Sequence, residues 1–249
     1  MGARTSYPPG TFSWAELATS DADAAKAFYT DVFGWEYRDD PVGEGMVYST
    51  ALLGGQAVAA LYASDQPPHW NSYVTVASAD QAAARAQELG GQLVSEPFDV
   101  LDVGRMAVIA DPTGATFCVW EPGTHVGAAV VNGPGALTWN DLITPDPGTA
   151  AEFYGGLLGW TFMEIPDSGG YRVIQNDARS NGGMMSREGM PPAWIPYFGH
   201  PDLDGFLRRV GELDGRALSE PVAVPSGRFA VIADAQGAVF AALTGDYDD

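Results

Sequence analysis

Two carboxylates stand in a setting that favours proton transfer. Glu16 follows Trp14 by two positions, and Asp141 follows Trp139 in the same way. Residues two apart in an extended strand share a face, so each carboxylate lies beside an indole ring. A carboxylate next to an indole in a poorly hydrated cleft has a raised pKa and could act as a general acid or base. The alternative, slightly favoured over catalysis, is a carboxylate that bonds a neighbouring strand or pairs with an arginine.

The two indoles themselves are candidates for ligand binding. Strand alternation predicts that Trp14 and Trp139 point into a cleft, because Leu17 and Leu142 must point toward the helices. An exposed indole offers a flat or polycyclic ligand a large stacking surface at low entropic cost. An indole that only fills space in the cleft is an equally good interpretation, and the sequence leaves both open.

Five further residues complete the candidate site. Arg105 and Arg228 each follow a glycine at the start of a predicted hairpin strand. They could bind a ligand carboxylate, but a salt bridge that neutralises the two carboxylates is the favoured interpretation. Asn71, Tyr73 and Tyr197 lie on predicted strands near the centre of each copy and could donate hydrogen bonds to a ligand. Tyrosine is also a common core residue, so this role stays open.

A tandem repeat must position these residues. Thr11–Tyr37 returns as Ala136–Phe162 with a constant spacing of 125 positions, and Gly104–Phe117 returns as Gly227–Phe240. A register kept over that length is not a chance match. A glycine-rich joint, Gly123–Gly135, separates the copies. The sequence therefore predicts two homologous domains, residues 8–124 and 134–245.

Within each copy the hydrophobic pattern changes in a fixed order. In the first, FSWAEL alternates as a strand does, and a helical pattern then runs from Asp21 to the stop at Gly34. Three strand-like runs follow, and the same strand–helix–three-strand order begins again at NSYVTV. We predict an α+β fold in which each domain is a pair of βαβββ modules.

That doubled module, the strand–Asp–helix–Phe-Tyr–Gly-Trp signature and the late Asp-x-x-Gly turn resemble the glyoxalase/bleomycin-resistance/extradiol-dioxygenase (vicinal oxygen chelate) superfamily. The two-domain form with WAEL and WNDL openings is similar to actinobacterial glyoxalase-like and hydroxylase-like proteins. The resemblance implies that each domain curls its modules into a barrel-like mixed sheet with a cleft on the concave face. It names no function, since the fold hosts metal-dependent isomerases, lyases and dioxygenases as well as metal-free drug-sequestering proteins.

The chain departs from the superfamily where a divalent ion would be held. The resemblance implies His, Gln or Glu ligands on the first and last strands of the modules. This sequence instead has indoles at Trp14 and Trp139, and the remaining positions carry Asn71, Ile195, Cys118 and Ala241. Its three histidines show no spacing typical of a metal triad. We therefore expect neither a metal nor another cofactor.

Composition limits the partners. The formal net charge is −20, from 32 acidic and 12 basic residues, and such a surface repels nucleic acid and anionic membranes. One cysteine permits no internal disulfide, and no apolar run is long enough to cross a bilayer. We expect a cytoplasmic protein whose partner is a small-molecule ligand. Four modules in one chain make a monomer sufficient, although a homodimer is possible.

Two functions from different classes follow. The favoured one is a metal-independent binding protein that sequesters or carries a mostly apolar metabolite or antibiotic in an aromatic cleft. The alternative is an enzyme of secondary metabolism or detoxification, such as a cyclase, isomerase, lyase or hydroxylase-like activity, with Glu16 or Asp141 as the acid or base. A metal-dependent glyoxalase or dioxygenase is the least favoured reading.

Overall fold

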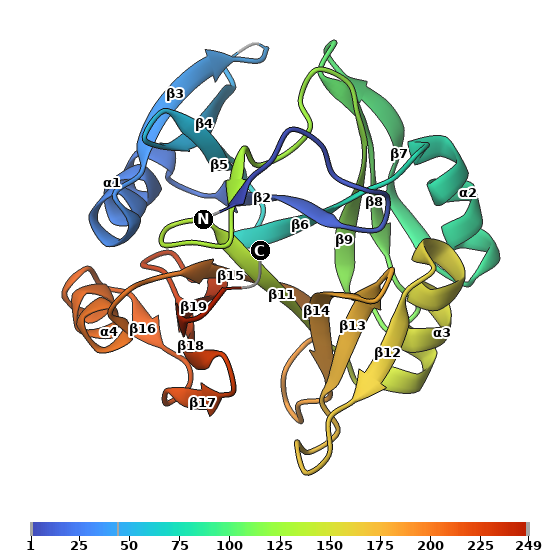
Figure 1. Ribbon diagram of the computed structural model, residues 1–249. Helices are drawn as coiled ribbons and strands as arrows, with labels where there is room; N and C mark the ends of the chain where they lie inside the picture. The colour runs from blue at the N-terminus through green and yellow to red at the C-terminus, as the bar shows by residue number, and fades with distance from the viewer. Residues whose placement is uncertain (1, 44, 248–249) are drawn as a thin grey trace.

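The computed structural model describes residues 2–43 and 45–247 and contains two large curled sheets, one from each copy of the repeat (Figure 1). A third, two-stranded sheet pairs β1 (Gly2–Ala3) with β10 (Val130–Val131), which ties the N-terminal arm to the joint between the copies. The fold is the predicted mixture of helices and strands.

The first copy forms an eight-stranded sheet in the order β3-β4-β5-β2-β6-β9-β8-β7. Its two modules meet where β2 and β6 pair antiparallel, and each module closes on itself through a parallel pair. The sheet path ends at β3 and β7, so it is curled but is not a closed barrel. Its elements are β2 (Phe12–Thr19), α1 (Ala22–Phe33), β3 (Glu36–Pro41), β4 (Val47–Leu53), β5 (Gln56–Ala63), β6 (His69–Thr75), α2 (Ala79–Glu88), β7 (Gln92–Val100), β8 (Gly104–Ala110) and β9 (Thr116–Pro122).

The second copy repeats this topology, with the order β12-β13-β14-β11-β15-β19-β18-β16 and with β17 also on β18. Its central pair is β11 against β15, as β2 pairs with β6 in the first copy. Its elements are β11 (Leu137–Ile143), α3 (Pro147–Leu158), β12 (Thr161–Glu164), β13 (Arg172–Asn176), β14 (Arg179–Met185), β15 (Ala193–Gly199), α4 (Leu203–Glu212), β16 (Arg216–Ala217), β17 (Val222–Val224), β18 (Gly227–Ala233) and β19 (Val239–Gly245).

The first helix of each copy begins and ends where the sequence predicts. Asp21 and Asp146 are the N-caps of α1 and α3, and their carboxylates accept bonds from backbone N–H groups of the first turn. Gly34 and Gly159 end the helices in the left-handed conformation, with φ of 71° and 73°. Glycine adopts that conformation without steric cost, so each chain turns directly into the next strand.

The two copies pack through their helix-bearing faces. Helix α1 lies beside α4, and α2 lies beside α3, on opposite flanks of the molecule (Figure 1). Each of the two largest core clusters draws residues from both copies: one joins Leu17 and Phe28 to Phe206, and the other joins Phe117 to Leu142. The prediction that Leu17 and Leu142 point toward the helices is confirmed. Each predicted domain contains one sheet, and their independence as folding units stays a prediction.

Two reciprocal hydrogen bonds cross this shared core. The Tyr29 hydroxyl donates to Asp234 of the second copy at 2.9 Å, and the Tyr154 hydroxyl donates to Asp111 of the first copy at 2.9 Å. Each aspartate uses its other oxygen to hold its own Asp-x-x-Gly turn. Both tyrosines are fully buried. The signature Phe-Tyr and Asp-x-x-Gly motifs therefore join the copies to each other.

Within the described part of the chain, no helix has the length and apolar character needed to cross a membrane.

We predict that Tyr29→Phe and Tyr154→Phe each lower the free energy of unfolding by about 1 to 3 kcal/mol, because each leaves a buried carboxylate oxygen without its donor. Urea denaturation measures the change. Tyr247→Phe is the matched control, since its half-buried hydroxyl bonds only backbone carbonyls. Equal losses in all three variants would show that the bonds between the copies are not special.

Candidate functional site

A buried carboxylate stands at the centre of the first-copy sheet. Glu16 on β2 accepts hydrogen bonds from the hydroxyls of Tyr48 at 2.8 Å and Tyr73 at 2.9 Å, one to each carboxylate oxygen. The Trp14 indole N–H donates to the Tyr48 hydroxyl at 3.1 Å. The predicted neighbours Trp14, Glu16 and Tyr73 are thus brought together, and Tyr48 on β4 completes the cluster.

The second copy builds the same cluster from equivalent residues. Asp141 on β11 accepts from Tyr197 at 2.6 Å and from Tyr171 at 2.8 Å. The Trp139 indole N–H donates directly to Asp141 at 2.9 Å and reaches the Tyr171 hydroxyl at 3.1 Å. The shorter aspartate thus gains a third donor. In both copies the central strand pair sets the tryptophan opposite a tyrosine.

Sequence reasoning missed Tyr48 and Tyr171. Strand register makes them equivalent. Ala60 and Gly183 pair with Glu16 and Asp141 on one side and with Thr50 and Val173 on the other, and each tyrosine lies two residues before the latter partner. Their flanking residues differ, with VYST around one and GYRV around the other. The faint signal was a tyrosine eight residues before the fourth strand of each first module, β5 or β14.

Burial perturbs both carboxyls. Glu16 and Asp141 are 9% and 3% exposed. Desolvation raises the pKa of each above its ordinary value, and the tyrosine hydroxyls oppose that shift by stabilising the anion. The two groups can therefore hold or release a proton nearer neutral pH than an exposed carboxyl can. Desolvation also raises the pKa of Tyr73 and Tyr197, so these tyrosines stay protonated donors.

The two tryptophans differ in what covers them. Trp14 is 3% exposed, and its ring packs edge-on against His125 with centroids 4.7 Å apart. Trp139 is only half-buried and lines a cleft. Of the two interpretations that the sequence left open, Trp14 matches the space-filling one, and Trp139 keeps the possibility of ligand contact.

The joint between the copies explains the difference. Residues 123–131 cross the concave face of the first sheet, and backbone bonds fasten them to Val103, Ser13 and Ala57 in turn. Tyr7 of the N-terminal arm packs in the same cluster and donates to the Ala128 carbonyl at 2.6 Å. The first-copy cluster is therefore sealed beneath the chain's own joint.

An open cleft of about 890 Å³ borders the second-copy cluster. Its walls come from the N-terminal arm, the joint, the start of β11 and the β13–β14 turn. The lining residues are Arg4, Ser6, Tyr7, Pro8, Thr11, Phe12, Val131, Asn132, Leu137, Thr138, Trp139, Asn140, Asn176, Asp177, Arg179, Ser180 and Asn181. This volume suits a drug-sized ligand. Asp141 does not line the cleft; Trp139 stands between the two.

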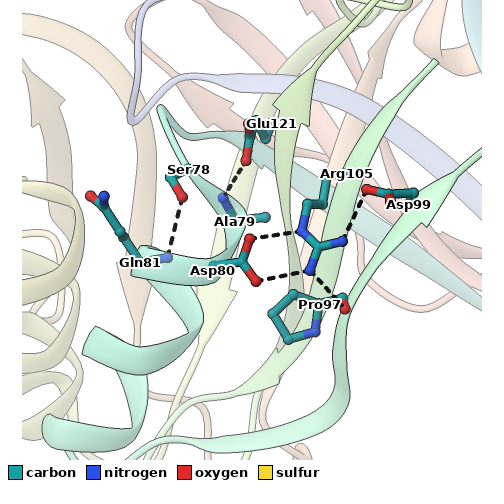
Figure 2. Close-up of polar contacts among 8 residues, drawn as sticks. All are labelled: Ser78, Ala79, Asp80, Gln81, Pro97, Asp99, Arg105 and Glu121. Atoms are coloured by element: carbon teal, nitrogen blue, oxygen red, sulfur yellow. Dashed lines mark hydrogen bonds and ion pairs between the residues drawn. The ribbon is translucent and has the colours of Figure 1, made fainter. Parts of the chain in front are cut away.

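Arg105 and Arg228 lie elsewhere. Figure 2 shows the Arg105 guanidinium between Asp80, in the first turn of α2, and Asp99 on β7, with Nε and Nη2 on the Asp80 carboxylate at 2.7 and 2.8 Å. Arg228 holds Asp204, in the first turn of α4, at 3.1 Å. The favoured interpretation of a salt bridge is right in kind, but the partners are aspartates in the first turns of α2 and α4, together with Asp99 on β7, and not Glu16 or Asp141.

Asn71 lies neither with the two arginines nor in the lining of the open cleft. It lies opposite Glu16 in the strand register, and its side chain is hydrogen bonded to Tyr62. Its role as a ligand donor, like that of the other predicted site residues, stays a prediction.

The donor set does not fit a divalent ion. Among residues 2–43 and 45–247, no three His, Cys, Asp or Glu side chains gather around a common point. The Glu16 oxygens already accept from two tyrosines, and burial raises the pKa of the nearby Cys118 thiol, which disfavours a thiolate ligand. Phenols, an indole and a protonated thiol are poor ligands for the ions that carboxylate and imidazole sites hold.

Comparison with known proteins identifies relatives of this chain. A family model described as the Glyoxalase/Bleomycin resistance protein/Dioxygenase superfamily matches residues 11–119. The chain is 42% identical to the "Putative glyoxylase CFP32" of Mycobacterium tuberculosis over 98% of both chains. It is 34% identical to the "Anthracycline biosynthesis protein DauV" of Streptomyces sp. over 96% of this chain and 94% of that one. The Mn(II)-bound glyoxalase from Novosphingobium aromaticivorans superposes with a TM-score of 0.67 at 18% identity, over 96% of this chain and 84% of that one.

We predict that the double variant Glu16→Gln/Asp141→Asn gains stability over the wild type as the pH rises. Each carboxyl has a folded-state pKa above its unfolded value of about 4, so its contribution to stability is complete below that pH. The contribution is lost as the pH rises through the folded-state pKa, and the amides do not titrate. Urea unfolding across a pH series measures the difference.

The matched control is Glu152→Gln, which removes an exposed carboxylate from α3. Its stability should follow the wild-type pH profile. A double variant that also follows the wild-type profile would contradict a raised pKa at either carboxyl.

Proposed function

This chain belongs to the Glyoxalase/Bleomycin resistance protein/Dioxygenase superfamily, and from that premise we propose that it is a metal-independent small-molecule-binding protein that works through its second-copy cleft. The observation that carries the proposal is the open cleft of about 890 Å³ with the half-buried Trp139 on its wall. A sealed first copy and an open second copy favour one ligand for each chain. A single chain therefore suffices for binding.

The ligand that suits this wall is planar and oxygenated. The Trp139 indole is fixed by its bond to Asp141, so it offers a flat face without losing side-chain freedom on binding. Hydroxyl and amide side chains, including Thr138, Asn140 and Ser180, share the lining. The mostly apolar ligand expected from the sequence is revised accordingly. A relative named for anthracycline biosynthesis supports a role in secondary metabolism and a polycyclic ligand.

Metal independence is supported by the donor set. The residues at the positions where the family resemblance implies ligands are indole, amide, thiol and aliphatic groups, and the two carboxyls are occupied by tyrosine hydroxyls. The cleft can bind a ligand by stacking and hydrogen bonding alone.

An enzymatic role is the second candidate, and the raised pKa of Asp141 favours it. A general acid or base must come within hydrogen-bond reach of its substrate. Asp141 is 3% exposed, is held by three donors and lies behind Trp139. Catalysis would need Trp139 to swing aside, whereas binding needs no change, so we rank binding first.

We predict that 1,8-dihydroxyanthraquinone, a planar oxygenated probe, binds the wild type and that Trp139→Ala weakens its binding about tenfold or more, the loss of one stacking face. Isothermal titration calorimetry measures the dissociation constant. The matched control is Trp14→Phe, at the sealed equivalent position, which should keep wild-type affinity. Dialysis against EDTA should change neither the affinity nor the stoichiometry.

Either of two results would overturn the proposal: equal affinity losses in the Trp14 and Trp139 variants, or a stoichiometric metal that survives dialysis and is needed for binding.

The variant Asp141→Asn separates binding from catalysis. The amide oxygen can still accept from Trp139 and Tyr171, so the probe should bind within about twofold of the wild-type affinity, a difference below 0.5 kcal/mol. Calorimetry gives the affinity, and mass spectrometry of the incubated probe detects conversion. Unaltered probe with both proteins supports a binding protein. Conversion by the wild type that the variant abolishes would establish the enzyme instead.

A further inference from the structure

The open cleft is positively charged in a strongly acidic chain. Acidic residues outnumber basic ones 32 to 12, yet two arginines, Arg4 and Arg179, line the cleft against one carboxylate, Asp177. Asp177 and Arg179 are both exposed at the β13–β14 turn, and Arg4 is half-buried. If the cleft lining had the same ratio of acidic to basic residues as the whole chain, it would carry a net negative charge.

Neither arginine is neutralised within the described residues. Six of the basic side chains there hold ion pairs: Lys26, Arg38, Arg85, Arg105, Arg209 and Arg228. Among the described residues, Arg4 makes only a 3.3 Å side-chain bond to the Ala3 carbonyl, and the Arg179 side chain has no hydrogen-bond or ion-pair partner. Both guanidinium groups therefore keep donors for a ligand.

The arm that carries Arg4 is held in place. The Arg4 backbone N–H donates to the Ala129 carbonyl at 2.9 Å, next to the β1–β10 pair. Farther along the arm, Asn176 donates to the Pro9 carbonyl and Asn181 to the Gly10 carbonyl. Two amides of the β13–β14 wall thus fasten the arm that forms the opposite part of the cleft lining.

One of these two charges, that of Arg179, is particular to the second copy, whereas Arg4 comes from the N-terminal arm. Strand register makes Gln56 the first-copy equivalent of Arg179, because Ala60 and Gly183 occupy the same place beside the buried carboxyls. The repeat would supply an uncharged amide there. The open copy carries the cation, and the sealed copy does not.

We propose that the ligand of the cleft is a planar carboxylic acid, whose ring system stacks on Trp139 and whose carboxylate pairs with Arg4 and Arg179. This inference rests on the proposed binding function. A guanidinium fork matches a carboxylate with two parallel N–H···O bonds. A single negative charge also meets less repulsion from the acidic surface than a doubly charged phosphate does.

The test compares two probes of the same shape, anthraquinone-2-carboxylate and its uncharged amide, by isothermal titration calorimetry. We expect the wild type to bind the carboxylate about tenfold more tightly than the amide at low salt, with the preference shrinking as salt screens the charges. In Arg4→Gln/Arg179→Gln the preference should vanish while the amide keeps its affinity. The control is Arg208→Gln, which removes an exposed cation on α4 that does not line the cleft and should keep the preference.

The outcomes are distinct. A wild type that binds both probes equally, or a double variant that keeps the preference, overturns the anionic-ligand inference while the binding function stands. If neither probe binds in a manner that depends on Trp139, the proposed function itself fails. Circular dichroism of the double variant checks that the arm substitution leaves the fold intact.

Discussion

The reciprocal bonds between the copies are the constraint on which the rest of the structure depends. Two pairs, Tyr29 with Asp234 and Tyr154 with Asp111, each bury a phenol against a carboxylate, and losing either partner leaves the other buried without its hydrogen bond. Because each aspartate also holds its own hairpin turn through its other oxygen, one residue positions both the turn and the contact between the copies. The helix-bearing faces are consumed in this contact. The concave faces are thereby turned away from each other, and the open cleft forms where the N-terminal arm, the start of β2, the joint and the second copy meet.

The same buried cluster of one carboxyl, two phenols and one indole occurs in both copies. The joint covers the first cluster, whereas the second borders an open cleft. The chain leaves the first sheet at β9 and must reach β11, and its path crosses the concave face of the first copy. A single joint can seal only one of two equivalent faces. The asymmetry is therefore a consequence of connectivity, and it explains why Trp14 is packed against His125 while Trp139 borders a cleft. A repeat under such a constraint can keep one copy as a structural partner and leave the other to bind.

The carboxyls illustrate how environment decides a residue's chemistry. The superfamily resemblance implies metal ligands on the strands around these carboxyls, whereas the proposed binding function needs no metal. Tyrosine hydroxyls satisfy both oxygens of each carboxyl without supplying positive charge, so burial raises the pKa of each group. The sequence analysis paired Arg105 and Arg228 with these carboxyls, but the two arginines instead form ion pairs with aspartates in the first turns of helices α2 and α4. A positive charge near the cleft comes from Arg4 and Arg179, which no repeat or motif marks.

The sequence by itself determined the fold and which residues share one face of each central strand. The repeat spacing, the capped helices and the Phe-Tyr and Asp-x-x-Gly motifs specify the modules, and the two-residue alternation places Trp14 beside Glu16 and Trp139 beside Asp141. Because those features are local and periodic, the amino-acid sequence alone predicts them. Tertiary structure alone decided that Tyr48 and Tyr171 complete the clusters, that Arg105 turns to Asp80, and that one cleft is sealed while the other stays open. These outcomes depend on how far a side chain reaches across a curled sheet and on the path of one joint through space, neither of which leaves a periodic trace in the chain.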